Sequence, residues 1–162
     1  MTADVGLRAV TANDDAFLVR LYGTTRPEVS QFGWDEAEQQ AFISMQFQMQ
    51  TRSYAMQYPN AEQSIVTYKG SSAGRLIVDR SSSIQLTDIA VLPEFRGKGI
   101  ATTVIKRLQD EASRTGRDLD LTVERMNGNA FHLYRKLGFE ITAEGQIHIS
   151  MKWAPTKNLK TK

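Results

Sequence analysis

The stretch LTDIAVLPEFRGKGIA, residues 86–101, contains a strand, a glycine-rich turn and the start of a helix. Its first part is rich in apolar and β-branched residues, as is typical of a buried strand. Pro93 ends this strand because proline has no N–H to donate to a sheet. After the turn, apolar residues recur every three or four positions, which predicts a helix from Gly99 to Thr115.

The turn itself has the composition of an anion-binding site. The first N–H groups of a helix have no internal partners, and the helix dipole adds roughly half a positive charge there. Gly97 and Gly99 allow a ligand to approach the backbone closely, and Arg96 and Lys98 add positive charge. The expected ligand is a phosphate or pyrophosphate, and the alternative is an ordinary tight turn with two solvated basic residues. The glycine spacing matches neither the dinucleotide fingerprint nor the P-loop.

The composition is that of an ordinary soluble globular protein. The chain has 162 residues, of which 41% are hydrophobic and 23% charged, and its net charge of +2 is too small to indicate nucleic-acid binding. It has no cysteine and only two histidines, so no metal site is expected. The sequence shows no membrane-spanning run and no signal-peptide pattern, so a cytoplasmic protein that binds no membrane is expected.

Hydrophobic periodicity predicts a single mixed α/β domain over residues 1–154, followed by a flexible lysine-rich tail at 155–162. Helices are expected at about 14–22, 35–58, 99–115 and 127–137, and strands at 6–10, 64–68, 74–79, 84–92, 119–123, 139–143 and 146–153. Turn residues between 64 and 92 predict an antiparallel meander, whereas the helix at 99–115 predicts a parallel strand pair. The central sheet is therefore expected to be mixed and mostly antiparallel.

The long helix at 35–58 carries two apolar stripes. Phe42, Met45, Met49 and Met56 form one, and Ile43, Phe47, Tyr54 and Tyr58 form the other. One stripe can pack on the sheet. The other requires a different partner, which is either the preceding helix, a substrate or a second subunit. A polar lane rich in glutamine separates the two stripes and, with the two tyrosines, could wall a substrate site.

Two motifs then occur in order along the chain. The first is Val91-Leu92-Pro93-Glu94 followed by Arg96-Gly97-Lys98-Gly99-Ile100-Ala101, and the second is Asn127, Ala130, Tyr134, Leu137, Gly138 and Phe139. They resemble the cofactor loop and the second signature of the GCN5-related N-acetyltransferase (GNAT) superfamily. The resemblance covers nearly the whole chain.

The resemblance implies a GNAT fold that binds acetyl-CoA as its acetyl donor and contains no metal. It places the pyrophosphate on the backbone of Gly97 to Ala101 and the pantetheine arm along the strand at Ile89 and Val91. The two parallel strands would separate near Val91 and Val123 to admit the arm. The cofactor-binding residues implied are Ile89, Val91, Arg96, Gly97, Lys98, Gly99, Ile100, Ala101 and Asn127, of which Asn127 either touches the cofactor or caps its helix.

Amine acetylation requires a base, a donor to the thioester oxygen, and an acid for the leaving thiolate. By resemblance, the Ile89 N–H is the donor and Tyr134 is the acid, and an ordinary tyrosine pKa of about 10 lies close enough to that of a thiol. Many relatives place a glutamate on the central strand, where this chain has Gln85 and Thr87. The base is therefore Asp88, Glu124 or water.

The function implied is an acetyl-CoA-dependent N-acetyltransferase that acts by direct transfer on the primary amine of a small molecule or peptide. The alternative is a non-catalytic acyl-CoA-binding sensor or scaffold. No nucleic-acid partner is expected, and a homodimer is a further option. His132 lies two residues from Tyr134, on another side of its helix, and is interpreted as a surface residue.

Overall fold

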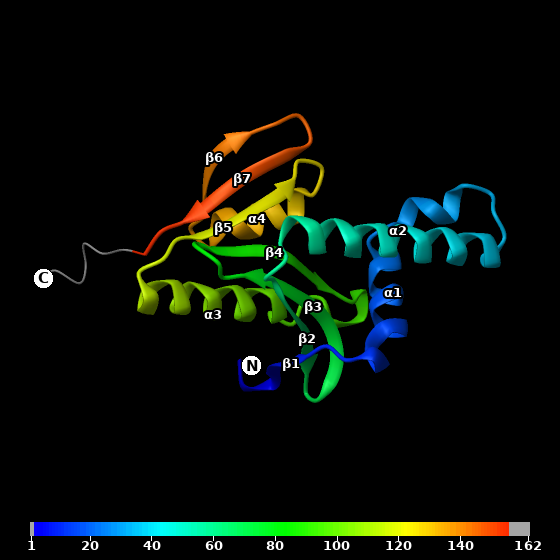
Figure 1. Cartoon of the computed structure of the whole chain (residues 1–162), viewed down its shortest axis with the longest axis horizontal. Helices are drawn as coiled ribbons and strands as arrows, with labels where there is room; N and C mark the ends of the chain where they lie inside the picture. Colours follow the sequence, from blue (N-terminus) through cyan, green and yellow to red (C-terminus); the bar gives the residue numbers. More distant parts are fainter. Residues whose placement is uncertain (1, 156–162) are drawn as a thin grey trace, which may run out of the picture.

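The computed structural model describes residues 2–155, which form a seven-stranded sheet flanked by four α-helices (Figure 1). The helices are α1 (Asp15–Thr24), α2 (Glu36–Gln57), α3 (Ile100–Thr115) and α4 (Gly128–Lys136). The strands are β1 (Val5–Ala9), β2 (Glu62–Tyr68), β3 (Ser71–Asp79), β4 (Ile84–Val91), β5 (Leu119–Glu124), β6 (Glu140–Glu144) and β7 (His148–Trp153). Each expected helix and strand is confirmed, with ends that differ by at most three residues. The predicted lysine-rich tail lies, apart from Pro155, outside the described residues.

The strand order in the sheet is β1-β2-β3-β4-β5-β7-β6. Among the strands of residues 2–155, only β4 and β5 run parallel, so the expectation of a mixed and mostly antiparallel sheet is confirmed. Their pairing covers three residues on each strand and ends at Leu86 and Leu121. The two strands therefore separate earlier than the predicted points near Val91 and Val123.

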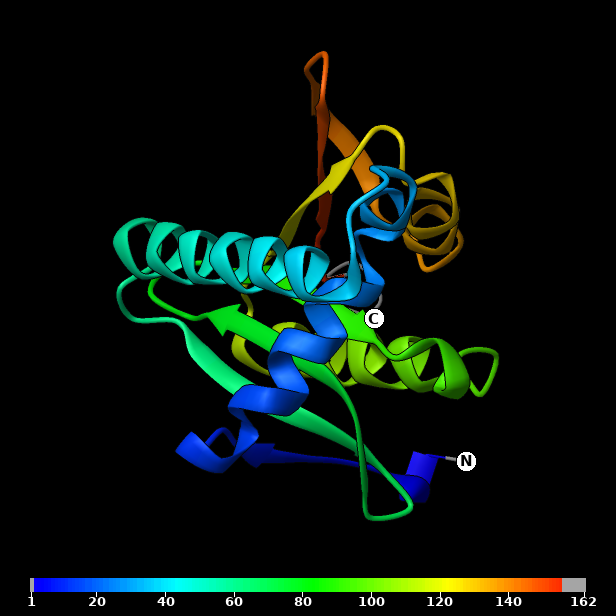
Figure 2. The same ribbon diagram turned by 90° about the vertical axis from the view of Figure 1, so that its right-hand side faces the viewer.

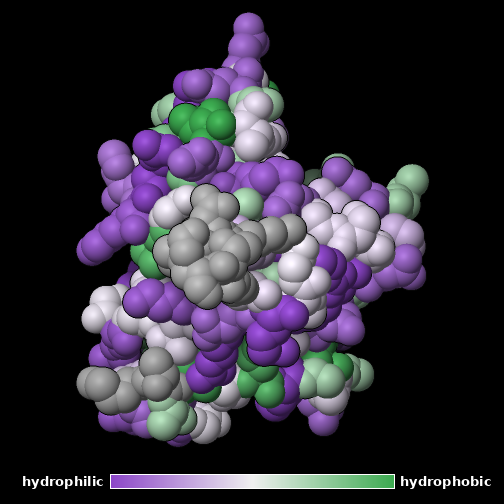
Figure 3. All heavy atoms as spheres, turned by 90° about the vertical axis from the view of Figure 1, so that its left-hand side faces the viewer, coloured by the Kyte–Doolittle hydropathy of each residue, from purple (hydrophilic) through white to green (hydrophobic). Residues whose placement is uncertain are grey.

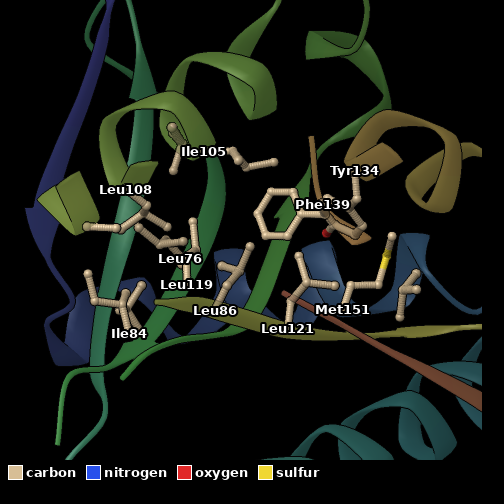
Figure 4. Close-up of a cluster of buried hydrophobic side chains, with 14 of the residues drawn as sticks. Leu76, Ile84, Leu86, Ile105, Leu108, Leu119, Leu121, Tyr134, Phe139 and Met151 are labelled. Atoms are coloured by element: carbon tan, nitrogen blue, oxygen red, sulfur yellow. The ribbon is translucent and has the colours of Figure 1, made fainter. Parts of the chain in front are cut away.

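Buried side chains divide between the two faces of the sheet, because successive residues of a strand point to opposite faces. On β3, Leu76 and Val78 belong to one buried cluster with residues of α3 and α4, whereas Ile77 lies outside that cluster. Figure 4 shows part of this cluster, with Tyr134 and Phe139 close to Met151. The other face of the sheet is covered by α1 and α2 (Figure 2).

The local sequence accounts for where the long helices begin and end. Asp35 caps α2, since its carboxylate accepts a hydrogen bond from the Glu38 N–H at 2.8 Å and the Glu38 carboxylate accepts one from the Asp35 N–H at 3.1 Å. Gly116 ends α3 with φ of 69°, a left-handed conformation that favours glycine. Short 3₁₀ turns at Ala12–Asp14, Pro27–Gln31 and Pro93–Phe95 were not expected from periodicity.

The two stripes of α2 have different surroundings. Phe47 packs edge-on against Tyr22 of α1, with ring centroids 5.7 Å apart, and Ile43 lies against Gly23. This stripe therefore packs on the preceding helix. On the other stripe, Met45 and Met56 are exposed, while Phe42 packs with Phe32 and Trp34.

The side where α3 ends and β5 begins, at the left of Figure 1, is mostly hydrophilic (Figure 3). No helix within residues 2–155 is long and apolar enough to cross a membrane.

Candidate active site

A cleft of about 610 Å³ opens where β4 and β5 separate. Its walls come from α1, α2, β3, β4, β5, α4, the start of β7 and Arg96 of the glycine-rich turn. The cleft therefore brings together segments of the chain that lie far apart in the sequence. Of the predicted site residues, it contains Asp88, Ile89, Arg96, Glu124, Asn127 and Tyr134, whereas Val91 and residues 97–101 are not part of its lining.

The turn before α3 has the geometry of an anion site. Gly97 and Gly99 have φ of 78° and 76°, and both α-carbons face open space. The backbone N–H groups of residues 97–101 donate no hydrogen bond to any of the residues 2–155. Arg96 lines the adjacent cleft, and the Lys98 ammonium lies 6.0 Å from the ring centroid of Tyr68. Unpaired amides at a helix N-terminus between two basic residues suit a phosphate group.

The second half of β4 has one free edge. Ile89 and Val91 pair with Leu76 and Gly74 of β3, and β5 no longer pairs with β4 beyond Leu86. Gly74 is needed at this point, because a β-carbon there would collide with the carbonyl oxygen of Ala90. An extended ligand can therefore lie along the free edge of β4.

Asp88 is held in place by a buried arginine. The Arg75 Nε donates to Asp88 Oδ2 at 3.1 Å, and the Arg75 Nη2 contacts the same oxygen and donates to Gln50 Oε1 at 3.0 Å. Arg75 is only 5% exposed. Its role was missed from the sequence, where the available signal was a single arginine within the apolar strand AGRLIVD.

An irregularity in β4 accompanies this pair. Ile77 is opposite Asp88 but Val78 is opposite Leu86, so Thr87 bulges out of the pairing. The Thr87 hydroxyl is buried and has no hydrogen-bond partner among residues 2–155. It therefore leaves a donor and an acceptor available beside the cleft.

Tyr134 lies on α4 with its ring against Phe139, and it is 8% exposed. Burial, with a smaller contribution from the negative charge of Asp88, raises the pKa of Tyr134 to about 12. This value lies above the ordinary one expected from the sequence. Its hydroxyl therefore stays protonated at neutral pH, as a hydrogen-bond donor must.

The other predicted residues have distinct surroundings. The Asn127 side chain accepts a hydrogen bond from the Ala130 N–H at 3.2 Å, which confirms its role as a helix cap, while its contact with a cofactor stays a prediction. His132 is exposed, as expected, whereas His148 lines the cleft and was missed. Residues 2–155 contain no group of three or more side chains suited to hold a metal.

The remaining wall of the cleft is formed largely by α2. Tyr54, Tyr58 and the glutamines Gln50 and Gln57 line it, while their contact with a substrate stays a prediction. Burial, followed by the charge of Asp88, raises the pKa of Tyr54 to about 12, so this hydroxyl is also neutral.

A mixed sheet that opens between two parallel strands, beside an unpaired glycine-rich turn, is the N-acyltransferase architecture that the two motifs predicted. The chain belongs to the family described as "Acetyltransferase (GNAT) domain", whose model matches residues 28–155. The resemblance seen in the sequence is thereby confirmed.

Known proteins show the same relationship. The chain is 30% identical over 101 residues to the thialysine N-epsilon-acetyltransferase of Mus musculus, which covers 55% of this chain and 59% of that protein. It is 40% identical over 58 residues to the spermidine N(1)-acetyltransferase of Escherichia coli K12, which covers 35% of this chain and 31% of that protein. The chain thus spans less than two thirds of either relative.

Among solved structures, the PaiA N-acetyltransferase of Thermoplasma acidophilum in complex with coenzyme A superimposes with a TM-score of 0.69. The match covers 93% of this chain and 98% of that one at 15% identity, and it shows a shared fold.

Proposed function

We propose that this protein transfers the acetyl group of acetyl-CoA directly to a primary amine of a small molecule or peptide. The unpaired amides of residues 97–101, at the N-terminus of α3 and beside the free edge of β4, carry this proposal. The named relatives support it, because both are acetyltransferases that act on amines.

The residues of the cleft fit the two parts of acetyl-CoA that the protein must hold. The amides of residues 97–101, with Arg96 and Lys98, would bind the pyrophosphate. The free edge at Ile89 and Val91 would pair with the amides of the pantetheine arm. The bound thioester supplies the activated acetyl group.

The chain's own groups then serve the reaction. The Ile89 N–H would donate to the acetyl oxygen as negative charge develops there. Tyr134, which is protonated and lines the same cleft, would donate to the leaving sulfur.

Two carboxylates lie on the face of the sheet that α1 and α2 cover, which we call the amine side of the cleft because the amine would enter there. Asp88 and Ile77 are opposite each other on one face of the sheet, and Glu124 points to the same face because its neighbour Val123 belongs to the cluster on the other face. Asp88 Oδ1 accepts no hydrogen bond from residues 2–155, so it would hold the incoming ammonium. Glu124 forms no ion pair within the described chain and would take the proton, directly or through water.

Two measurements test this proposal. Calorimetric titration should show binding of coenzyme A, and an acetyl-CoA consumption assay over polyamines, amino acids, aminoglycosides and peptides should show turnover with at least one class. Absence of coenzyme A binding would refute the proposal. Binding without turnover on any of these amines would favour the sensor or scaffold instead.

A further inference from the structure

Arg26, directly after α1, lies in the wall of the cleft and is partly buried. Its Nε donates to the Tyr22 hydroxyl at 3.0 Å, and its guanidinium carbon lies 5.0 Å from the centroid of the Tyr22 ring. Tyr22 is itself buried. The guanidinium is therefore held in a defined position by one hydrogen bond and one ring contact.

The charge of Arg26 has no counter-ion. It forms no ion pair within residues 2–155, although Arg8 pairs with Asp14 at 2.8 Å and Arg80 pairs with Glu111 at 2.6 Å. Of the other two arginines of the cleft, Arg75 is occupied by Asp88 and Gln50, and Arg96 belongs to the turn proposed to bind the pyrophosphate. Because a partly buried charge loses hydration, an unpaired guanidinium that faces a cleft favours a ligand anion.

The amine side of the cleft lies close to Arg26. Partial burial acts to lower the pKa of Arg26, but the Tyr22 hydroxyl and the carboxylates of Glu124 and Glu28 raise it more. Glu124 is thus near enough to interact with Arg26 without forming an ion pair with it. The Tyr54 hydroxyl, which also lines the cleft, is neutral. One cleft therefore offers carboxylates for an ammonium and a separate guanidinium for an anion.

We infer that the amine acceptor also carries a carboxylate, and that the two terminal nitrogens of Arg26 bind this carboxylate. This inference rests on the proposed acetyltransferase function and deepens it. The planar guanidinium fork matches a carboxylate in two parallel hydrogen bonds. A polyamine, by contrast, would place a second ammonium beside the positive charge of Arg26. The shared chemistry fits both a free amino acid and the C-terminus of a peptide.

The test uses pairs of amines that differ only in the carboxylate. L-lysine is compared with cadaverine, L-phenylalanine with phenethylamine, and the dipeptide Gly-Lys with its C-terminal amide. With the full-length protein and saturating acetyl-CoA, kcat/KM should be at least tenfold higher for the carboxylate member of at least one pair. The lysine and Gly-Lys pairs distinguish the free amino acid from the peptide.

Variants assign this preference to Arg26. Arg26→Gln should lower the ratio of kcat/KM within the pair by about 10- to 100-fold, mainly through KM, because a hydrogen bond to a charged group contributes roughly 1.5–3 kcal/mol. Arg26→Lys keeps the charge but loses the fork, so it should restore only part of the ratio. Arg52→Gln is the matched control, because Arg52 is an exposed arginine of α2 outside the cleft, and it should leave the ratio unchanged.

Calorimetric titration of the same pairs into the protein bound to coenzyme A separates this inference from the proposed function. A carboxylate preference in binding that Arg26→Gln abolishes supports the role of Arg26 even if no amine is acetylated. Equal binding and equal kcat/KM within every pair, a preference for the decarboxylated amines, or no binding of any amine would overturn the inference. The first two results would leave the acetyltransferase function standing wherever turnover is seen.

Discussion

Tyr134 is kept protonated by its surroundings. With a pKa of about 12, its hydroxyl is a much weaker acid than a thiol of pKa about 8.5. Complete transfer of its proton to a thiolate would be uphill by roughly 5 kcal/mol. In the proposed reaction, Tyr134 would therefore act as a hydrogen-bond donor to the leaving sulfur, and water would supply the proton afterwards. This differs from the near-balanced proton transfer expected from an ordinary tyrosine.

Replacing Tyr134 with phenylalanine removes this donor and little else. We expect kcat to fall at least tenfold, which corresponds to about 1.4 kcal/mol of lost transition-state stabilisation. The affinity for coenzyme A should change little, because the proposed pyrophosphate contacts come from residues 97–101 and not from Tyr134. Steady-state kinetics and calorimetry measure the two quantities. An unchanged kcat would remove Tyr134 from the mechanism.

The same pKa also predicts part of the pH profile. In the proposed mechanism Tyr134 acts in its protonated form, which it loses only near pH 12. Its deprotonation should therefore cause no decrease in kcat at any pH below 10. Any basic limb measured below pH 10 in the wild type should therefore persist in Tyr134→Phe. Loss of such a limb in the variant would contradict the high pKa.

The two carboxylates of the cleft should respond differently to neutralisation. Asp88 is the counter-ion of the buried Arg75, so it is suited to hold a cation, and Glu124 is left to accept the proton. We expect Glu124→Gln to lower kcat at least tenfold. Asp88→Asn should instead raise the KM for the amine and change kcat little. If Asp88→Asn lowered kcat and Glu124→Gln raised only the KM, these two roles would be exchanged.

At the scale of elements, the site depends on how α3 begins. Gly99 is the N-cap of α3 and has a positive φ, so alanine there costs about 1–2 kcal/mol of backbone strain. Gly99→Ala also places a methyl group where the phosphate is expected. We predict at least a tenfold weaker affinity for coenzyme A, measured by calorimetry, together with a lower Tm.

Gly116→Ala provides the matched control for this variant. Gly116 ends the same helix with φ of 69°, against 76° for Gly99, and neither α-carbon has an atom in the way. Both variants should lose similar stability in thermal unfolding, but Gly116→Ala should bind coenzyme A as the wild type does. Equal losses of affinity would mean that strain in α3, and not the turn, explains the effect.

Elements that depend on nearby residues could be predicted from the sequence, whereas features that depend on distant partners could not. The period of the apolar residues defined α3, and the pair Asp35 and Glu38 defines the start of α2. The bulge at Thr87 and the pair of Arg75 with Asp88 depend on the alignment of β3 with β4, which no local pattern specifies. Arg26 was missed for the same reason, because only the folded chain brings it to the cleft.

At the scale of the whole molecule, the sheet consists of two parts with a short connection. Strands β1 to β4 form one part and β5, β7 and β6 the other, and only three residue pairs of β4 and β5 join them. The final hairpin was expected, but the insertion of β7 between β5 and β6 was not, because it requires pairing with a strand earlier in the chain. The exposed methionines of α2 keep the homodimer a prediction.

A ligand in the gap between the two parts should stabilise the molecule as a whole. At a concentration 100 times its Kd, coenzyme A stabilises the folded state by about 2.7 kcal/mol. For a chain of this length, that corresponds to a Tm increase of about 5–10 °C. Thermal unfolding in the presence of coenzyme A measures the increase. Adenosine is the control, because it lacks the pyrophosphate that the turn is proposed to bind.

Hydrogen exchange locates the origin of that stabilisation. Bound coenzyme A should slow exchange at Ile89 and Val91 of β4 and at residues 97–101, because their amides acquire the partners that the rest of residues 2–155 does not supply. Amides at the edge of β6, far from the gap, should exchange at the same rate with and without the ligand. Protection confined to α1 and α2 would place the cofactor on the other face of the sheet. In that case the amine could not bind beside Arg26 as proposed, since that proposal assumes that coenzyme A is held at the N-terminus of α3.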